Sequence, residues 1–535
     1  MMKLFSIVST LLFIGSVGAQ SLGVTKLGQL TYTNSINDVW GYVDSATGTE
    51  YALVGVQDGL SIVNVDSAQN PTEVFFVNGA NSIWRDMKSF RHYAYAVHDV
   101  TSSFQTDGFT IVDMNTIENR FPTFFKRKPL IKLNDSVSEV FERAHNIYID
   151  ENGILYAFGS NVGAGGALMF DLKPDPTNPQ FLGIFNDYYL HDGVARGDTL
   201  WGAAVYNGFF SAIDVSSKTN PREMARKNTP FNFAHNIWFS DDNQRVFTTD
   251  ERSAAYIAEY DVSDLNNIEE LDLIRTSFGN DVVPHNAHFH NNFLFNSYYT
   301  SGLQIVDVSE PGVMVETGYY DTSPQSGDGF GGAWGAYPYL PSQHILVTDR
   351  QTGLWVFSST FPRAAFFQCS VQDSVSGANL LNAQIDFING SITGATDVFG
   401  NFKDGQRDSG VYDVRISKSG YASDTIRVTL KQGQKVQRLI KLAPLGLSVG
   451  NPQLWPAIEL YPNPTAGTLN LAHLPGAPKA LDLQILSLDG RLLYQETLAR
   501  GQTQWTGNLS LSAGTYLLRL RDEAKGSKQF TFIKR

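Results

Sequence analysis

The 535-residue sequence is poor in cysteine, in helical periodicity and in the short motifs of common enzymes. Its single cysteine, Cys369, excludes an intramolecular disulfide, so stability must come from packed area. Apolar residues do not recur at helical spacing, and beyond the N-terminus no apolar run is long enough to span a bilayer. Gly-x-Ser-x-Gly, His-Glu-x-x-His and phosphate-binding glycine loops are also missing. A disulfide scaffold and several common catalytic designs are therefore excluded.

The charge pattern excludes polyanionic partners. The formal net charge is -13, and the acidic residues are scattered rather than in runs, which argues against nucleic acid and against an anionic membrane surface. The 47 glycines, 21 prolines and 42% hydrophobic content are typical of a turn-rich globular protein. The length indicates two or three domains.

The N-terminus has the layout of a secretory signal peptide. Lys3 precedes an apolar run from Leu4 to Val17, and small residues follow up to Ala19. We therefore expect a signal peptide over residues 1–19, with cleavage near Ala19. No cysteine follows that site, which excludes a lipid anchor on a mature N-terminal cysteine.

Between residues 25 and 360 one unit is repeated seven times, at a spacing of roughly 45 to 50 residues. Each copy holds about four short strand-like phrases bounded by turn residues, and the third phrase is the clearest. It reads LSIVNVD, FTIVDMN, ALMFDLK, FSAIDVS, IAEYDVS, LQIVDVS and LWVFSS in turn. This pattern predicts a seven-bladed β-propeller. Six or eight blades stay open, because residues 120–143 are a longer insertion in the second unit.

The remaining chain predicts two small β units. Residues 364–444 alternate apolar and polar residues between Gly, Asp and Asn turns, as in a sandwich, and residues 458–535 do the same. Residues 445–457 are expected to be a linker. The predicted fold class is therefore all-β, a seven-bladed β-propeller followed by two small β-sandwich domains.

Aligning the repeats on the phrase Ala-His-Asn gives a column with histidine in four successive units. In a propeller such a column becomes a ring around the central channel, at the entry to the innermost strands. The column comprises Asn37, Arg85, His145, His191, His235, His285 and Trp334, and the next one comprises Asp38, Asp86, Asn146, Asp192, Asn236, Asn286 and Gly335. We therefore expect four imidazoles at one level of the channel, each beside a carboxylate or an amide.

Three interpretations of these histidines remain open. His145, His191, His235 and His285 could bind a transition metal such as zinc, copper or iron, with Asp or Asn as outer partners. Each histidine could instead hold its own blade by hydrogen bonds to Asp or to backbone. A polar pocket in which the histidines and Arg85 bind an organic ligand without metal is the third. His288 and His290 are expected on a strand surface.

Loops between the second and third strands open on the same side as the column, so both sets should form one polar rim, where binding sites collect. The predicted ligand-binding rim residues are Arg85, Asp86, Asp192, Asp250, Asp349 and Arg350.

Three parts of the sequence resemble known families. The phrases IVDVS, IVNVD and AIDVS resemble the LVIVD repeat, and residues 25–360 as a whole resemble the choice-of-anchor B family of exported bacterial proteins. Residues 364–444, with TDVFGNFKDG and GVYDVRISKSGY, resemble the carboxypeptidase-regulatory-like sandwich. The tail, with Tyr461-Pro462-Asn463-Pro464, Gly490 and Gly514-Thr515-Tyr516 in order, resembles the C-terminal sorting domain of type IX secretion in Bacteroidota.

The resemblances imply a location rather than a reaction. The tail implies passage through the periplasm and across the outer membrane, with the type IX machinery as partner and usually with removal of the tail. We expect a secreted or outer-membrane-surface binding module that engages a small ligand, a glycan or a partner protein at the propeller rim, with the sandwich as spacer. The alternative is a metal-dependent enzyme, a hydrolase or oxidase, that uses the four histidines as ligands with Arg85 or Glu142 near the substrate.

Overall fold

The computed structural model describes residues 20–100, 105–277, 279, 281–445, 458–474, 480–522 and 526–535. The expected signal peptide and residues 446–457 of the expected linker lie outside the described residues. Within them the chain is all-β, and a single-turn 3-10 helix, η1 (Met114–Thr116), is the only helical element. Residues up to Ser370, with 384–415 and 425–440, belong to one compact unit, and residues 371–383, 416–424 and 441–535 belong to another.

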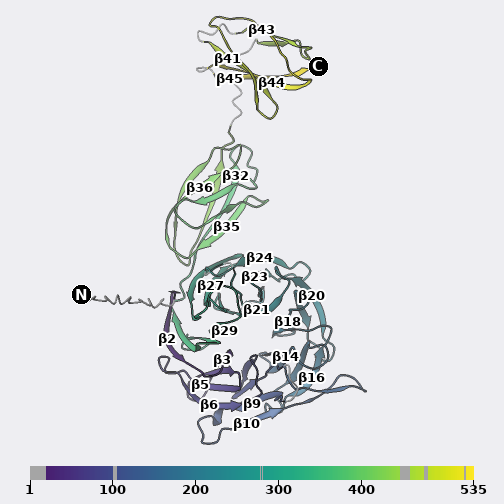
Figure 1. The fold of residues 1–535 in the computed structure, drawn as a ribbon, viewed down its shortest axis with the longest axis vertical. Coiled ribbons are helices and arrows are strands. Elements are labelled where there is room, and N and C mark those ends of the chain that lie inside the picture. Colours follow the sequence, from purple (N-terminus) through teal and green to yellow (C-terminus); the bar gives the residue numbers. More distant parts are fainter. Residues whose placement is uncertain are drawn as a thin grey trace, which may run out of the picture. The chain divides into compact units, whose positions relative to one another are not determined.

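Seven antiparallel sheets surround a central axis, as Figure 1 shows, which confirms the predicted propeller. The first strand of each blade is the innermost, because the first strands contact one another around the axis. Blade 1 comprises β3 (Ile36–Val43), β4 (Glu50–Val56), β5 (Gly59–Asn64) and β6 (Thr72–Asn78), and blade 2 comprises β7 (Met87–Phe90), β8 (Tyr93–Ala96), β9 (Phe109–Asp113) and β10 (Phe124–Arg127). Blade 3 comprises β13 (Asn146–Ile149), β14 (Ile154–Phe158), β15 (Ala167–Asp171) and β16 (Gln180–Phe185), and blade 4 comprises β17 (Asp192–Arg196), β18 (Thr199–Ala204), β19 (Phe209–Asp214) and β20 (Arg222–Asn228).

Blades 5 to 7 complete the ring. They comprise β21 (Ala234–Phe239), β22 (Arg245–Asp250), β23 (Ile257–Asp261) and β24 (Glu269–Ile274); β25 (Ala287–His290), β26 (Phe293–Tyr298), β27 (Gly302–Glu310) and β28 (Val313–Tyr320); and β29 (Ala333–Tyr337), β30 (Ile345–Asp349) and β31 (Gly353–Ser359).

The N-terminal segment closes the ring. Strand β2 (Val24–Leu30) pairs antiparallel with β31 as the fourth strand of blade 7, and β1 (Ser21–Leu22) adds to the outer edge of blade 6 beside β28. Blade 7 is therefore built from both ends of the propeller segment, which covers an edge that would otherwise be unpaired. With this shared blade the propeller has seven blades, and not the six or eight that the sequence left open.

The hydrophobic core lies between neighbouring blades. Tyr95 and Phe109 of blade 2 pack with Leu155 of blade 3 in one buried cluster, for example. Of the expected insertion, residues 120–143, Phe124–Arg127 form β10 of blade 2, and the segment after β10 forms a hairpin of β11 (Leu130–Lys132) and β12 (Ser138–Val140). Phe141 follows this hairpin, and its ring stacks on that of Phe109 at 4.4 Å. Phe141 is fully buried, which contributes roughly 2 to 3 kcal/mol. The insertion thus adds to the contact between blades 2 and 3 and forms no eighth blade.

Two smaller pairs of sheets follow the propeller. The first comprises the sheet β35-β32-β38 and the sheet β34-β33-β36-β37, and the second comprises β39-β40-β43 and β42-β41-β44-β45. Their strands are β32 (Ala365–Asp373), β33 (Gln384–Phe387), β34 (Thr393–Ala395), β35 (Asn401–Gln406), β36 (Gly410–Ser417), β37 (Asp424–Leu430), β38 (Lys435–Leu442), β39 (Glu459–Tyr461), β40 (Thr468–Ala472), β41 (Leu481–Ser487), β42 (Leu492–Leu498), β43 (Trp505–Asn508), β44 (Gly514–Asp522) and β45 (Gly526–Lys534). The first sandwich packs Phe367 against Phe387 at 5.2 Å. The second has its own core around Leu483, Trp505 and Leu518.

Side chains of the Asp and Asn column join adjacent blades. The Asp86 carboxylate of blade 2 accepts the backbone N–H of Ile147 in blade 3 (2.7 Å), and the Asn236 side-chain oxygen of blade 5 accepts the N–H of Ala287 in blade 6 (3.1 Å). Buried backbone donors that lack a partner in their own sheet are satisfied in this way. This column therefore supplies part of the connection between blades.

His288 of the innermost strand β25 does not lie on a strand surface as the sequence predicted. It is 5% exposed, and its ring lies 4.4 Å from that of Trp238 and 6.2 Å from that of Trp40. The expectation was wrong because the inner strand faces the axis, where the rings of blades 1 and 5 close around it. Burial, and then the charge of Lys88, lowers the pKa of His288 to about 3.

Gly335 offers a test of the column's packing. A Cβ at this position would lie 2.2 Å from the Asp38 Oδ1 and 3.0 Å from the Val39 nitrogen, since the Asp38 carboxylate of blade 1 occupies that space. We predict that Gly335→Ala lowers the free energy of unfolding by roughly 1 to 3 kcal/mol. In an Asp38→Ala background the same change should cost less, because the clashing carboxylate is gone. Equal costs in both backgrounds, measured by denaturant unfolding, would contradict this contact.

His288 should also make the fold sensitive to acid. Because its folded-state pKa lies below the unfolded value of about 6.5, the unfolded chain takes up a proton that the folded chain does not. Its contribution to stability is complete above pH 6.5 and is lost as the pH falls towards about 3, at a limiting slope of about 1.4 kcal/mol per pH unit. His288→Phe should flatten the decline in unfolding free energy between pH 6.5 and 4, whereas a substitution at the exposed His473 should not. An unchanged slope in His288→Phe would refute the assignment.

Candidate metal centre

Bulges in the innermost strands aim the histidine column at the axis. In blade 5, Ala234 pairs with Asp250 and Asn236 pairs with Thr249, which leaves His235 as the extra residue. The register shifts at the same place in blade 7, at Trp334. A bulge bends its strand and redirects the extra side chain. In blades 3 and 4 the N–H groups of His145 and His191 bond to the carbonyl of the residue that pairs with the next residue of the inner strand, so these histidines are extra residues of the same kind. The histidine column is therefore a repeated local distortion that turns these side chains towards the channel.

All four predicted histidines come together at the channel mouth. Ring centroids lie 3.9 Å apart for His145 and His191, 4.3 Å for His191 and His235, and 4.6 Å for His235 and His285. Trp334 continues this arc 4.5 Å beyond His285. The imidazoles of blades 3 to 6 thus form one curved stack rather than separate contacts within each blade.

The nitrogens of this stack meet in two overlapping triads. The first triad is His145, His191 and His235, and the second is His235, Glu251 and His285. Within each triad one donor atom per residue lies within 4.8 Å of the others. A cavity of about 20 Å³ lies beside this stack and is lined by His145, His235 and His285, but not by His191. A water molecule needs about 10 to 15 Å³, so this cavity has room for an ion or a water molecule and not for an organic ligand.

Three of the four histidines have their Nδ1 atom engaged. His145 Nδ1 lies 3.3 Å from an Asp99 oxygen, His191 Nδ1 lies 3.2 Å from an Asp192 oxygen, and His285 Nδ1 lies 2.6 Å from the Trp334 carbonyl. An acceptor at Nδ1 fixes the ring and the tautomer, so that Nε2 keeps its lone pair for a metal. Carboxylate partners on histidine ligands are a recurrent arrangement at zinc sites.

His235 lies at the centre of the arc and is the least satisfied of the four. Its side chain is 3% exposed, and its Nδ1 has no hydrogen-bond partner among the described residues. Its Nε2 lies 3.8 Å from a Glu251 oxygen, and the Tyr299 hydroxyl donates to the other oxygen of Glu251. A buried imidazole nitrogen without a partner is costly, and a bound cation would satisfy it.

The electrostatics of the site suit a cation. Burial lowers the pKa of His285 to about 3 and that of His235 well below its usual range, so both rings stay neutral. Burial alone would raise the pKa of Asp192, but its hydrogen bond to His191 and the charges of nearby histidines hold that pKa well below its usual range. The pKa of Asp99 is lowered against its burial by His145 and Arg143. Ionised carboxylates therefore lie beside neutral rings at His235 and His285, whereas the hydrogen bond to Asp99 and the charge of Asp192 raise the pKa of His145 against its burial.

The predicted rim residues divide into two groups. Arg85, Asp86 and Asp192 border the cavity, although the Arg85 guanidinium donates to the carbonyls of Val56 and Ala80. The other three do not border it, and their side chains hold rim loops: Asp250 accepts the N–H groups of Phe231 and Phe233, Asp349 accepts those of Gln351 and Thr352, and Arg350 donates to the Phe330 carbonyl.

Sequence reasoning placed Glu251 and Asp99 in the rim loops but did not select them as site residues. Both residues belong to rim loops that follow the second strand of a blade. Side chains alternate along an extended chain, so when Asp250 turns towards Phe231 and Phe233 in the loop before β21, Glu251 turns the other way, towards His235. This alternation was the available signal, and it would have favoured Glu251 over Asp250.

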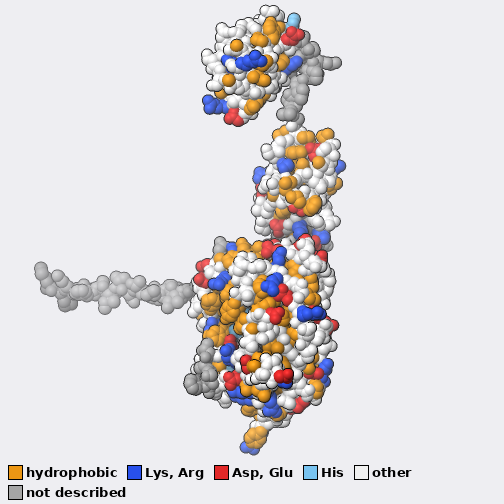
Figure 2. Space-filling model, turned by 90° about the vertical axis from the view of Figure 1, so that its right-hand side faces the viewer, with side chains coloured by type: hydrophobic (Ala, Val, Ile, Leu, Met, Phe, Trp, Pro, Cys, Tyr) orange, Lys and Arg blue, Asp and Glu red, His pale blue; other side chains and the backbone are white. Residues whose placement is uncertain are grey.

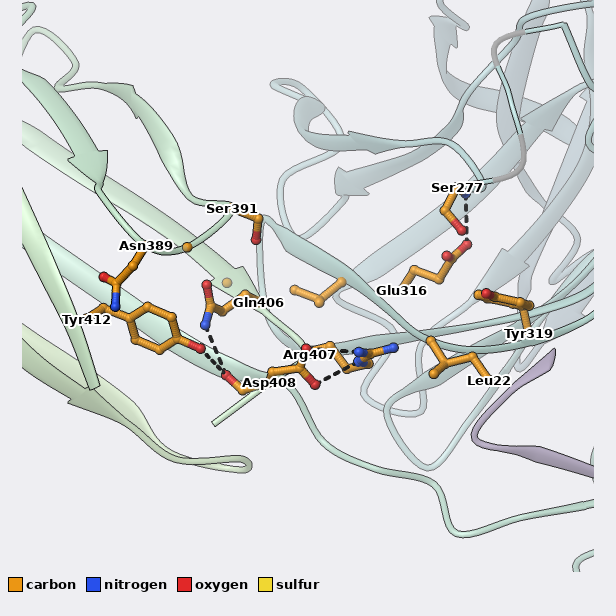
Figure 3. A pocket seen from close by; sticks show the side chains of 13 residues that line it. Leu22, Ser277, Glu316, Tyr319, Asn389, Ser391, Gln406, Arg407, Asp408 and Tyr412 are labelled. Carbon is orange, nitrogen blue, oxygen red and sulfur yellow. Dashed lines mark hydrogen bonds and ion pairs between the residues drawn. The ribbon is translucent and has the colours of Figure 1, made fainter. Parts of the chain in front are cut away.

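Elsewhere among the described residues, no comparable group of His, Cys, Asp and Glu donors occurs. Acidic and basic side chains are interspersed over the side of the propeller that Figure 2 shows. A second cavity, of about 550 Å³, lies beside β28 and β35 within the first compact unit. Figure 3 shows its polar groups bonded to one another, with Glu316 accepting the Ser277 N–H and Arg407 paired with Asp408 at 2.9 Å. No histidine and no predicted site residue lines this cavity.

Comparisons with known proteins cover the tail and one repeat. Residues 459–534 match the family described as the secretion system C-terminal sorting domain, and residues 291–322 match the LVIVD repeat. No curated protein matches the chain. Among solved structures, the β-propeller domain of Cps50 (Swd1) from Myceliophteria thermophila is similar at 9% identity and a TM-score of 0.43, over 63% of this chain and 100% of that chain. At that TM-score the similarity carries no argument about function.

The tail match determines the destination of the protein. Together with the LVIVD match it supports a propeller that is exported by type IX secretion and is secreted or displayed at the cell surface. Among the described residues, no helix is long and apolar enough to cross a membrane.

Proposed function

We propose that this protein is a secreted or cell-surface binding module whose propeller holds a transition metal ion at the mouth of its central channel. The observation that carries the proposal is the convergence of His145, His191 and His235, whose donor nitrogens lie within 4.8 Å of one another. Such a group suits zinc, copper or iron, since imidazole is a good ligand for each. The cavity of about 20 Å³ favours an ion over the organic ligand that the sequence left open.

The outer contacts favour a metal over a purely structural role for the histidines. The buried Nδ1 of His235 has no hydrogen-bond partner among the described residues, which is also true of His288, so it supports a metal only together with the convergence of the three donor nitrogens. Blades are already joined at the level of the next column by Asp86 and Asn236. The contacts of His145 with Asp99 and of His285 with the Trp334 carbonyl add to these links, so the histidines combine a contact between blades with a nitrogen that can bind a metal.

The other parts of the chain fit a display role. We assign residues 25–360 to a choice-of-anchor B-like propeller and residues 364–444 to a carboxypeptidase-regulatory-like sandwich that acts as a spacer. Residues 458–535 then direct export, and residues 445–457 link the two C-terminal domains. A metal-dependent hydrolase or oxidase is the second candidate function, because both triads match ligand sets found at catalytic zinc.

Metal binding can be tested directly. After chelation and reloading with Zn²⁺, the purified protein should retain one equivalent through gel filtration, and His145→Ala/His235→Ala should retain none, because two donors of the first triad are lost. His290→Ala/His344→Ala, two substitutions outside the site, should bind like the parent. Elemental analysis measures the stoichiometry, and a parent without retained metal would contradict the proposal.

The tail should be required for export but not for folding of the propeller. Removing residues 458–535 deletes the sorting match, whose core is separate from the propeller clusters. We expect the truncated protein to accumulate in the periplasm, with its propeller folded and Zn²⁺ retention unchanged. Cell fractionation with an antibody to the propeller measures the location. Normal secretion of the truncated chain would overturn the role given to the tail.

A further inference from the structure

The donor atoms at the channel mouth meet in threes. Among the described residues, no His, Cys, Asp or Glu adds a fourth donor to either triad. Structural zinc sites in proteins are almost always closed by four protein ligands, whereas catalytic sites have three and leave one position to an exchangeable ligand. The number of donors thus distinguishes an open centre from a closed one.

The blades opposite the histidines supply no ligand. At the same level of the ring, blades 7, 1 and 2 carry Trp334, Asn37 and Arg85. Tryptophan and arginine do not ligate metals, and the Asn37 side-chain oxygen already accepts the Asp38 N–H at 3.0 Å. A metal at the histidines is therefore held from one side of the axis only, and its other side is free.

The hydrogen bonds and the exposure of the first triad favour metal binding more than those of the second triad. His145 and His191 each have a carboxylate on Nδ1, and their side chains are 13% and 12% exposed, at the mouth. In the second triad, Glu251 is already bonded to the Tyr299 hydroxyl, and His285 is only 2% exposed. A metal in the first triad is reached from outside, while one in the second is not.

We propose that the metal is held by His145, His191 and His235 alone, and that its fourth position stays open to a small exchangeable ligand at the channel mouth. This inference rests on the proposed function. The ligand is limited to a few atoms, such as water or a small inorganic anion, because the cavity measures about 20 Å³ and the indoles of Trp84 and Trp334 border it. Glu251, beside His235, is placed to accept a hydrogen bond from a ligand that carries a proton.

Azide is a suitable probe of the open position, because it is a small anion that changes the visible spectrum of Co²⁺ when it binds. The full-length protein is loaded with Co²⁺ and titrated with azide. A saturable spectral change is expected. A parent that binds Co²⁺ and does not respond to azide overturns this inference and leaves the proposed function standing, whereas a parent that binds no Co²⁺ contradicts the proposed function itself.

Matched variants identify the triad. His191→Ala should weaken Co²⁺ binding by about 100-fold or more, and His285→Ala by less than about 10-fold, although each removes one imidazole from the same arc. Asp99→Asn, which acts through His145 and has no counterpart in the second triad, should weaken binding by about 10- to 100-fold. Circular dichroism checks that each variant is folded. The opposite order, with His285→Ala the more damaging, would overturn the assignment.

Discussion

The hydrogen bonds at Nδ1 of the channel histidines are the interactions on which the candidate site depends. Four imidazoles packed side by side without them could rotate and exchange tautomers, and their lone pairs would have no common direction. The contacts of His145 with Asp99, of His191 with Asp192 and of His285 with a backbone carbonyl remove that freedom. Each occupies one nitrogen of its ring and leaves the other nitrogen for a metal.

These contacts exist because the propeller brings separate chain segments to one level. Asp99 comes from a loop of blade 2, 46 residues before its partner in blade 3, and the Trp334 carbonyl lies 49 residues beyond His285. The bulges turn the histidines inwards, while the column directly after them joins the blades. The Ala-His-Asn phrase and its equivalents in other blades therefore have two tasks: the histidine belongs to the candidate site, and the next residue joins adjacent blades. The histidine can change without loss of the contacts that the next residue makes.

Features that recur in every unit could be predicted from the sequence, whereas features that occur only once could not. The histidine column was predicted because seven copies of a unit make its position a ring, and the third strands were read from the same repetition. The closure of blade 7 by β2 was not, since its pairing partner lies over 300 residues away and local pattern carries no sign of it. The roles of Asp250 and Glu251 depended on which of two adjacent carboxylates turns inwards, which is decided by strand alternation and by the backbone donors of Phe231 and Phe233. Burial of His288 depended on aromatic rings from blades 1 and 5 that only the closed ring places together.

The composition of the site fits the destination of the protein. Outside the cell, thiolate ligands are prone to oxidation, and a metal centre built on them would need protection. The chain has one cysteine, which is buried in the first sandwich with its thiol pKa raised by burial to about 12, so it offers no thiolate. Imidazole and carboxylate donors carry no such liability. An exported propeller that binds a metal would therefore be expected to use histidine and acidic residues, and these are the residues that its repeats bring to the channel mouth.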